Sequence, residues 1–359
     1  MRRLAPTIVL YGLLLVLALV HREVLSETFA QLAHISVWSV GGLLVLVFLV
    51  VAARGYLLAA STPGLQLKRA MSADQVALAA AYGIVVGGGP VGVAAKVTMF
   101  RKWGISSSNI ATSLVATAVV PTFTTWGLAV VVHMPEAIRG TATTAESLAV
   151  VVGTATICFS AVFWTCVCLF ERPVKVIAFL SDRIRRTFLK IIPVRFLRTR
   201  ETIGALQPHL FLEAVRLQLR ELFRVRAFRI VRGALFVPFA AFLTLLFSLR
   251  VSGATEISVV EALSAFALVR VIVSLSPIPG GVGLAEIGLV SLLTTAGATE
   301  VHAAGATMLY RAVTWLAPMV IGGYGWWRWR RELRDEKFTH TMEAHNGYVH
   351  DKTEVVTIT

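Results

Sequence analysis

The sequence predicts an all-α polytopic membrane protein with six full spans, two re-entrant helical hairpins and an inverted-topology repeat. Of its 359 residues, 56% are hydrophobic and only 15% are charged, and the mean hydropathy is +0.75. Several apolar runs approach the roughly 20 residues that a helix needs to cross a bilayer. Two further apolar runs are interrupted by glycine and proline. No pattern of alternating strands and turns indicates a barrel, so we expect about eight helical membrane segments.

The six uninterrupted runs predict the full spans. They lie at about residues 5–20, 35–53, 108–132, 147–170, 233–249 and 303–327. The first resembles a signal peptide, but His21, Arg22 and Glu23 follow it where a small-x-small cleavage site would stand, so we interpret it as an uncleaved span. The three cysteines, Cys158, Cys166 and Cys168, fall within one run and are interpreted as reduced packing residues.

Each of the two interrupted segments carries a break that a simple anchor would not need. Segment 74–100 is broken at 87–90, and segment 261–296 is broken at 277–283. Proline removes a backbone donor, and glycine allows positive φ and close backbone approach. In hydrocarbon, the freed backbone groups are tolerated only where protein or a water-filled cavity satisfies them. The breaks are therefore costly in an anchor and useful at a binding site.

The distribution of basic residues predicts the orientation of the chain. Lys and Arg gather at 2–3, 54–69, 96–102, 171–232 and 328–334, whereas the connections 21–34, 133–146 and 250–260 contain few of them. Cytoplasmic loops carry the excess of Lys and Arg. This assignment holds only if the first interrupted segment enters and leaves on the cytoplasmic side and the second on the outer side. We therefore predict two re-entrant hairpins in the cell membrane, with both termini in the cytoplasm.

This orientation makes the two membrane halves inverted copies of each other. We divide the chain into a first membrane half (1–170), a basic segment (171–232), a second membrane half (233–330) and a polar cytoplasmic tail (331–359). A weak sequence similarity between Pro90–Lys96 and Gly281–Glu286 supports the repeat. Interrupted helices in corresponding positions of two halves mark the binding site of many transporters. The alternative is that the glycines merely allow close helix packing.

Ionisable residues near the breaks define a candidate site. Arg270 precedes the second break, Glu286 follows it, Arg311 lies within the last span, and Lys96 follows the first break. We expect the three cations to line a polar cavity that binds an anionic phosphate head group, with Glu286 as their internal partner. The alternative is a structural Glu286–Arg311 ion pair, with Lys96 extending to the cytoplasmic interface. The other candidate site residues are Gly88, Gly89, Pro90, Pro277, Pro279, Gly280, Gly281, Gly283 and Tyr310.

The basic segment contains a predicted amphipathic helix at 209–229. One face carries Leu212, Val215, Leu219 and Leu222, and another carries Arg216, Arg220 and Arg224. Such a helix suits contact with anionic lipids of the inner leaflet, or it forms a cytosolic elbow between the two halves. The net charge of +14 is explained by this topology, so we expect no nucleic-acid partner.

The motifs of the second half resemble those of a known family. The runs Pro277–Glu286 and Leu309–Pro318 resemble the signature of the lysylphosphatidylglycerol synthase transmembrane (flippase-like) family. The stretch Gly87–Gly104 is similar to its Gly-rich basic segment, although Val93 and Lys96 stand where the family often has Glu and Arg. The resemblance implies movement of an anionic or aminoacylated phospholipid, or of a polyprenyl-phosphate-linked lipid, between leaflets. The synthases also carry a cytosolic aminoacyl-transfer domain after the membrane region, and because only the polar tail follows the last span here, we expect no lipid aminoacylation by this chain.

Two other functions are left open. One is a membrane-embedded transferase that uses a lipid-phosphate donor, and the other is a non-catalytic partner of a separate glycosyl- or aminoacyl-transferase. No paired-Asp motif or Ser/His/Asp set appears, and Glu286 is the only carboxylate that the pattern places deep in the membrane. We therefore expect no catalytic residue, no metal and no cofactor. A second copy of the chain and a separate transferase are the open alternatives for a protein partner.

Overall fold

The computed structural model is helical throughout the part of the chain that it describes. The described residues are 26–27, 30, 35–83, 88–170, 208–276 and 278–331, and no strand occurs within these ranges. The all-α class is therefore confirmed for this part of the chain. The predicted span 5–20, residue Gly87, most of the basic segment, Pro277 and the polar tail beyond 331 lie outside the described residues.

Four helices are long and apolar enough to cross a membrane. They are α3 (Val37–Ser61), α6 (Ser107–Arg139), α7 (Thr144–Leu169) and α10 (Pro208–Val251) from Leu212 onward. They confirm the apolar runs predicted at 35–53, 108–132, 147–170 and 233–249 as helices. At about 1.5 Å per residue, α6 is about 50 Å long, which exceeds a hydrocarbon core of about 30 Å. Its ends therefore extend beyond the depth of such a core.

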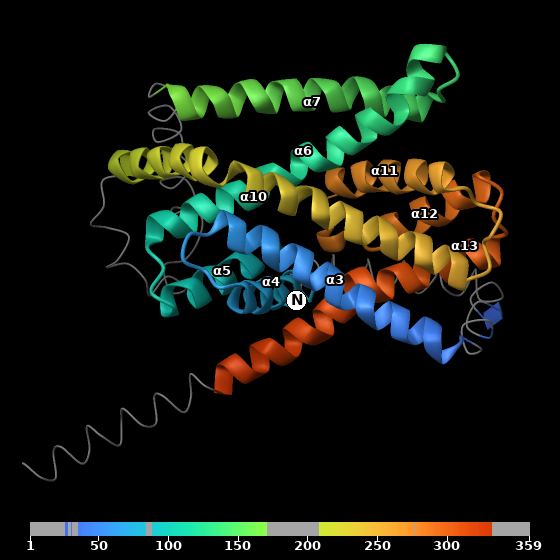
Figure 1. Ribbon diagram of the computed structural model, residues 1–359, viewed down its shortest axis with the longest axis horizontal. Coiled ribbons are helices and arrows are strands. Elements are labelled where there is room, and N and C mark those ends of the chain that lie inside the picture. The colour runs from blue at the N-terminus through green and yellow to red at the C-terminus, as the bar shows by residue number, and fades with distance from the viewer. Residues whose placement is uncertain are drawn as a thin grey trace, which may run out of the picture.

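The long helices pack on one another (Figure 1). Helix α10 runs alongside α3 and crosses α6, and α7 packs on α6. The buried face of α10 places Ile230 and Ala234 against Leu57 of α3 and Ala116 of α6. The sequence predicted a separate amphipathic segment before the span at 233–249, but a single uninterrupted helix contains both.

The start of α10 is amphipathic as predicted, but its apolar face contacts protein. Val215, Leu219 and Leu222 are buried, and Leu222 packs in the same core as Ile230. Arg220 and Arg224 are exposed, whereas Arg216 is buried. Contact of this region with anionic lipids stays a prediction, and the exposed arginines are the side chains available for it.

Two pairs of short helices occupy the interrupted segments. Helices α4 (Leu67–Tyr82) and α5 (Gly88–Lys102) pack side by side and antiparallel, with Gly92 so close to α4 that a Cβ there would lie 2.5 Å from the Ala77 carbonyl oxygen. Helices α11 (Val259–Leu275) and α12 (Leu284–Thr295) form the second pair. Each interrupted segment is therefore a helical hairpin.

The first hairpin differs in detail from the prediction. Helix α4 begins at Leu67, so the basic residues Lys68 and Arg69 lie in its first turn and not in a loop. The predicted break included Gly88, Gly89 and Pro90, but these residues form the first turn of α5. Proline is tolerated there because the first turn of a helix has no intrahelical partner for its N–H groups.

The last predicted span contains an irregular turn. Helix α13 (Glu300–Arg311) continues into the π-helical segment η3 (Ala312–Leu316), and residues 317–331 are helical again. A π turn inserts one residue into the helical repeat and changes the direction of the side chains that follow, and it occurs often at functional sites. The helix after η3 packs on α4, since a Cβ on Gly322 would overlap the Gln75 backbone.

The cysteines are free, as predicted, but they differ in exposure. Cys166 and Cys168 are partly buried, whereas Cys158 is exposed. The prediction that all three are packing residues therefore does not hold for Cys158, which is not packed within the described part of the chain.

Candidate functional site

The two hairpins meet at their tips. The turn η2 (Pro279–Gly281) joins α11 to α12 and contacts α4. At Gly280, which has φ +72°, a Cβ would lie 2.8 Å from Nε1 of Trp315 and 3.2 Å from Cε1 of Tyr82. Tyr82 is the last residue of α4, and its ring stacks on Trp315 with centroids 6.2 Å apart. The tip of the second hairpin, the end of α4 and the π segment therefore share one contact.

The predicted Glu286–Arg311 ion pair is present at this contact. Arg311 Nε donates to Glu286 Oε1 at 2.6 Å, and Glu286 Oε2 accepts the Gly283 N–H at 2.7 Å. The Arg311 guanidinium also lies over the Trp315 ring, 5.4 Å from its centroid. Only 14% of the Arg311 side chain is exposed. One carboxylate thus joins the start of α12 to α13 and fixes the guanidinium beside the tip.

Arg270 lies nearby on α11 with a different set of partners. Its Nη2 donates to Thr125 Oγ1 of α6 at 3.0 Å, and its guanidinium lies 5.5 Å from the centroid of Phe266. Phe266 in turn packs edge-on against Tyr310. Within the described part of the chain, no carboxylate forms an ion pair with Arg270, and its Nε has no hydrogen-bond partner. Its charge is therefore not neutralised by an acidic side chain in this part of the chain.

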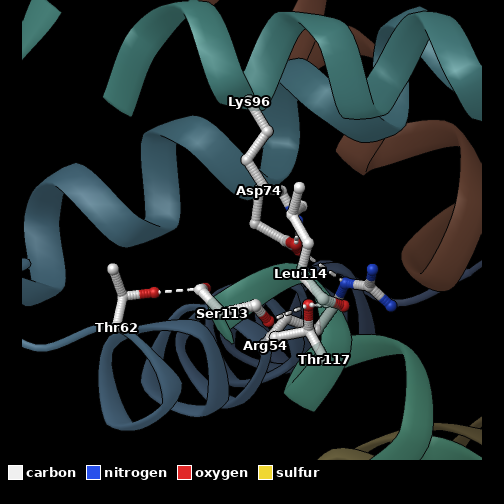
Figure 2. A network of polar contacts seen from close by, with 7 residues as sticks. All are labelled: Arg54, Thr62, Asp74, Lys96, Ser113, Leu114 and Thr117. Atoms are coloured by element: carbon white, nitrogen blue, oxygen red, sulfur yellow. Dashed lines mark hydrogen bonds and ion pairs between the residues drawn. The ribbon is translucent and has the colours of Figure 1, made fainter. Parts of the chain in front are cut away.

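A second charged cluster links α3, α4 and α5 (Figure 2). Arg54 Nε lies 2.8 Å from one carboxylate oxygen of Asp74, and Lys96 Nζ lies 3.3 Å from the other. In Figure 2, Lys96 reaches Asp74 from above and Arg54 from below. The Asp74 side chain is only 9% exposed. Two cations thus share one buried carboxylate, which joins three helices.

This cluster corrects two expectations. Asp74 is a carboxylate buried between helices, in addition to the expected Glu286, and the sequence pattern did not single it out because it stands at the boundary of the predicted segment. Lys96 turns toward Asp74, with only 13% of its side chain exposed, so the alternative of an extended interfacial lysine is wrong. Lys96 therefore belongs with Asp74 and not directly with Arg311.

The two clusters together carry an excess of positive charge. The two clusters share α4, since Asp74 belongs to one and Tyr82, eight residues or about 12 Å along the same helix, contacts the other. In the described ranges, the cations Arg54, Lys96, Arg270 and Arg311 stand against the carboxylates Asp74 and Glu286. Such a group suits an anionic ligand. The polar cavity itself stays a prediction.

Two adjoining pockets form a groove between α3 and α10 that the sequence did not predict. The apolar pocket, about 730 Å³, is lined mainly by Ala52, Leu235, Phe236 and Phe239. The neighbouring pocket, about 520 Å³, is lined by Arg226, Arg229 and Arg232 together with Gly64, Leu65 and Gln66. Tyr56, Leu67 and Arg232 belong to both. We call these two pockets the α3–α10 groove; one end is apolar and the other is basic.

Tyr56 and Arg232 hold the middle of the α3–α10 groove. Both Nε and Nη2 of Arg232 donate to the Tyr56 hydroxyl, the former at 3.1 Å, and the guanidinium lies 5.0 Å from the Tyr56 ring centroid. A separate pocket of about 600 Å³ between α6, α7 and α10 has almost entirely apolar walls.

Replacing Gly280 by alanine should separate the hairpin tip from Trp315. The new Cβ would overlap the indole and the residue would also occupy positive φ, so we expect a loss of about 2–4 kcal/mol of stability from steric overlap and backbone strain together. The measurement is the midpoint of thermal unfolding in detergent.

Gly104→Ala is the matched control for this substitution. Gly104 has φ +75°, yet a Cβ there would meet nothing within 4 Å. Its replacement should cost only the backbone strain, about 1–2 kcal/mol. Equal losses in the two variants would contradict the tight contact of the tip with Trp315.

Comparison with known families bears on most of the chain. The model of the family described as "Lysylphosphatidylglycerol synthase TM region" matches residues 4–322. Searches of curated proteins and of solved structures found no match. The match includes both hairpins, the Glu286–Arg311 pair, the Asp74 cluster and the α3–α10 groove.

Proposed function

Because the chain belongs to the lysylphosphatidylglycerol synthase TM region family, we propose that it moves a lipid between the two leaflets of the cell membrane. Family membership and the apolar helices establish a membrane protein related to lipids. The proposed substrate is an anionic or aminoacylated phospholipid, or a polyprenyl-phosphate-linked lipid. These lipids share a phosphate group within an otherwise apolar molecule.

The observation that carries this proposal is the contact of the hairpin tips beside an excess of cations. Helices α4, α5, α11 and α12 have 16, 15, 17 and 12 residues. At about 1.5 Å per residue, none of them is long enough to cross a hydrocarbon core of about 30 Å. We therefore propose that α4–α5 re-enters from the cytoplasmic side and α11–α12 from the outer side, as an inverted repeat whose tips meet inside the membrane.

The charged residues suggest how a phosphate would pass the tips. Arg270 has no acidic partner among the described residues, and Arg311 presents the face that Glu286 leaves free. A guanidinium binds phosphate oxygens through paired hydrogen bonds. In this proposal, the stacked Tyr82 and Trp315 close the path between the tips, and their separation opens it.

The α3–α10 groove has the shape and chemistry of an inner-leaflet lipid site. Arg226, Arg229 and Arg232 recur every three residues on α10, so they lie on one side of the helix. The apolar pocket with Phe236 and Phe239 continues from them along α3. We propose that the arginines bind the phosphate and the apolar walls hold the first part of a lipid tail.

Transport in liposomes tests the proposal. The purified chain is reconstituted with fluorescent phosphatidylglycerol or phosphatidylcholine, and a membrane-impermeant quencher reports exchange between leaflets. We expect faster exchange of phosphatidylglycerol than in protein-free liposomes. Arg229→Gln with Arg232→Gln should slow that exchange about tenfold, which corresponds to about 1.4 kcal/mol of lost lipid binding.

Arg224→Gln provides the control on the same helix. Arg224 is exposed, and its acidic partner among the described residues is Glu221 of its own helix, so the exchange rate should not change. Rates equal to those of protein-free liposomes for both lipids would sink the transport proposal. If Arg224→Gln slowed lipid exchange as much as Arg229→Gln with Arg232→Gln, the α3–α10 groove would not be the lipid site.

The deep carboxylates do not favour the alternative of a lipid-phosphate transferase. Both oxygens of Asp74 contact cations, and both oxygens of Glu286 accept hydrogen bonds. A general base needs a carboxylate oxygen that faces the substrate. The geometry therefore supports a binding and structural role for both residues.

A further inference from the structure

The turn between α6 and α7 gathers three potential metal ligands, although the sequence analysis expected no metal. His133 and Glu136 lie near the end of α6, and Glu146 lies in the first turn of α7. One ligand atom from each residue lies within 4.8 Å of the other two. None of these residues belongs to the proposed transport path, so their arrangement needs a separate explanation.

Local backbone structure fixes the position of Glu146. Helix α6 ends at Arg139, Gly140 caps it with φ +73°, and Thr143 then caps the start of α7. Glu146 Oε2 accepts the Thr143 N–H at 2.7 Å and the Thr143 hydroxyl at 2.8 Å. This capping box uses Oε2 and leaves Oε1 directed toward His133.

The distances fit a shared ion better than direct hydrogen bonds. His133 Nδ1 lies 3.5 Å from Glu136 Oε2 and 3.6 Å from Glu146 Oε1. Charge-assisted N–H···O bonds are about 2.7–2.9 Å long. Ligands about 2.0–2.1 Å from a tetrahedral Zn²⁺ lie about 3.3–3.4 Å apart. The observed N···O separations of 3.5 and 3.6 Å are closer to this ligand–ligand distance than to the length of a hydrogen bond.

Burial gives independent evidence for a missing partner. The His133 side chain is completely buried, and neither ring nitrogen has a hydrogen-bond partner among the described residues. Glu136 Oε2 is likewise buried without a hydrogen bond, although 37% of that side chain is exposed. Buried polar atoms normally have partners, so two such atoms facing each other indicate a ligand between them.

We propose that His133 Nδ1, Glu136 Oε2 and Glu146 Oε1 bind a small divalent cation of the Zn²⁺ class. One imidazole nitrogen and two carboxylate oxygens suit Zn²⁺, and the two carboxylates balance its charge. The partly exposed Glu136 gives the ion access, and water completes the coordination. The ion would join α6 to α7 at the turn that the sequence predicts to face outward.

Metal content of the full chain, purified with a tag that contains no histidine, tests this site. The protein is stripped with chelator, equilibrated with Zn²⁺ and measured by mass spectrometry of the metal. Wild type should hold one more Zn²⁺ per chain than His133→Asn or Glu136→Gln. Other histidines in the sequence can also bind Zn²⁺. The test is therefore the difference in Zn²⁺ content between wild type and each variant, and not the total Zn²⁺ content.

Glu256→Gln is the matched control. Glu256 lies 3.9 Å from His302 and forms a His–carboxylate pair that lacks a second acid among the described residues. Its replacement should leave the Zn²⁺ content unchanged. Zn²⁺ should also raise the unfolding temperature of wild type and Glu256→Gln, but not that of Glu136→Gln. Should His133→Asn fail to fold, the partly exposed Glu136 decides the result. Equal Zn²⁺ content in wild type and Glu136→Gln would overturn the proposal.

Discussion

Arg311→Ala should both destabilise the protein and reduce lipid exchange in liposomes to the protein-free rate. The substitution leaves Glu286 Oε1 without its 2.6 Å partner and removes the cation beside Trp315. Removing one member of a buried ion pair costs about 3–5 kcal/mol. Since 37% of the Glu286 side chain is exposed, we expect about 3 kcal/mol, measured as a change in unfolding free energy in detergent.

Arg330→Ala is the control for Arg311→Ala. Arg330 lies 5.3 Å from the ring centroid of Trp326, so it has a similar aromatic contact but no acidic partner in the described part of the chain. Its loss should have little effect on stability or exchange. Wild-type stability and exchange in Arg311→Ala would contradict the importance of the pair.

Glu286→Gln separates the ion pair from the helix cap. Glutamine keeps an acceptor for the Gly283 N–H but loses the charge that faces Arg311. Glu261→Gln is the matched substitution at the same position of α11, where the carboxylate caps Ser258 and contacts no arginine among the described residues. A larger loss of exchange in Glu286→Gln than in Glu261→Gln would identify the contribution of the Arg311 pair.

Local sequence patterns predicted much of the architecture because they act over short distances. Apolar length predicts a helix that can cross a bilayer, and Pro and Gly interrupt it within a few residues. Glu286 and Arg311 could be paired although they lie on two helices, α12 and α13, because each is an ionisable residue in an apolar run near the second break, where an unpaired charge is costly.

Tertiary contacts account for what the sequence did not reveal. Asp74 joins Arg54 and Lys96 across three helices. Tyr82 contacts Trp315, which lies in a π-helical segment that no residue pattern predicts. The α3–α10 groove likewise depends on how two distant helices pack. The continuous helix α10 shows the reverse case, since its change from basic to apolar composition suggested a boundary that the backbone does not have.

Asp74→Asn should be the most destabilising single substitution among the charged residues of the two clusters. It leaves Arg54 and Lys96 close together in a buried setting without the carboxylate they share. The expected cost is about 3–5 kcal/mol, because uncompensated buried charge is added to the loss of two ion pairs. Lys96→Met should cost less, since Asp74 keeps Arg54 at 2.8 Å. Thermal and denaturant unfolding in detergent would measure this order.

A triple substitution would distinguish structural from transport roles of the Asp74 cluster. Replacing Arg54 and Lys96 by Met and Asp74 by Leu removes every charge together, and apolar replacement of a buried charged group is often neutral or stabilising. We therefore expect stability near that of wild type. If the cluster also contributes positive charge to the lipid path, this stable variant should exchange phosphatidylglycerol more slowly than wild type.

Glu221→Gln is the control for the Asp74 series, because the Glu221–Arg224 pair is exposed and should affect neither stability nor exchange. Full exchange in the stable triple variant would show that Arg54, Asp74 and Lys96 only hold the first hairpin against α3. The phosphate would then have to depend on Arg270 and Arg311, which the Arg311→Ala measurement tests separately. If the Asp74→Asn protein were as stable as wild type, the stabilising role of the carboxylate that Arg54 and Lys96 share would be contradicted.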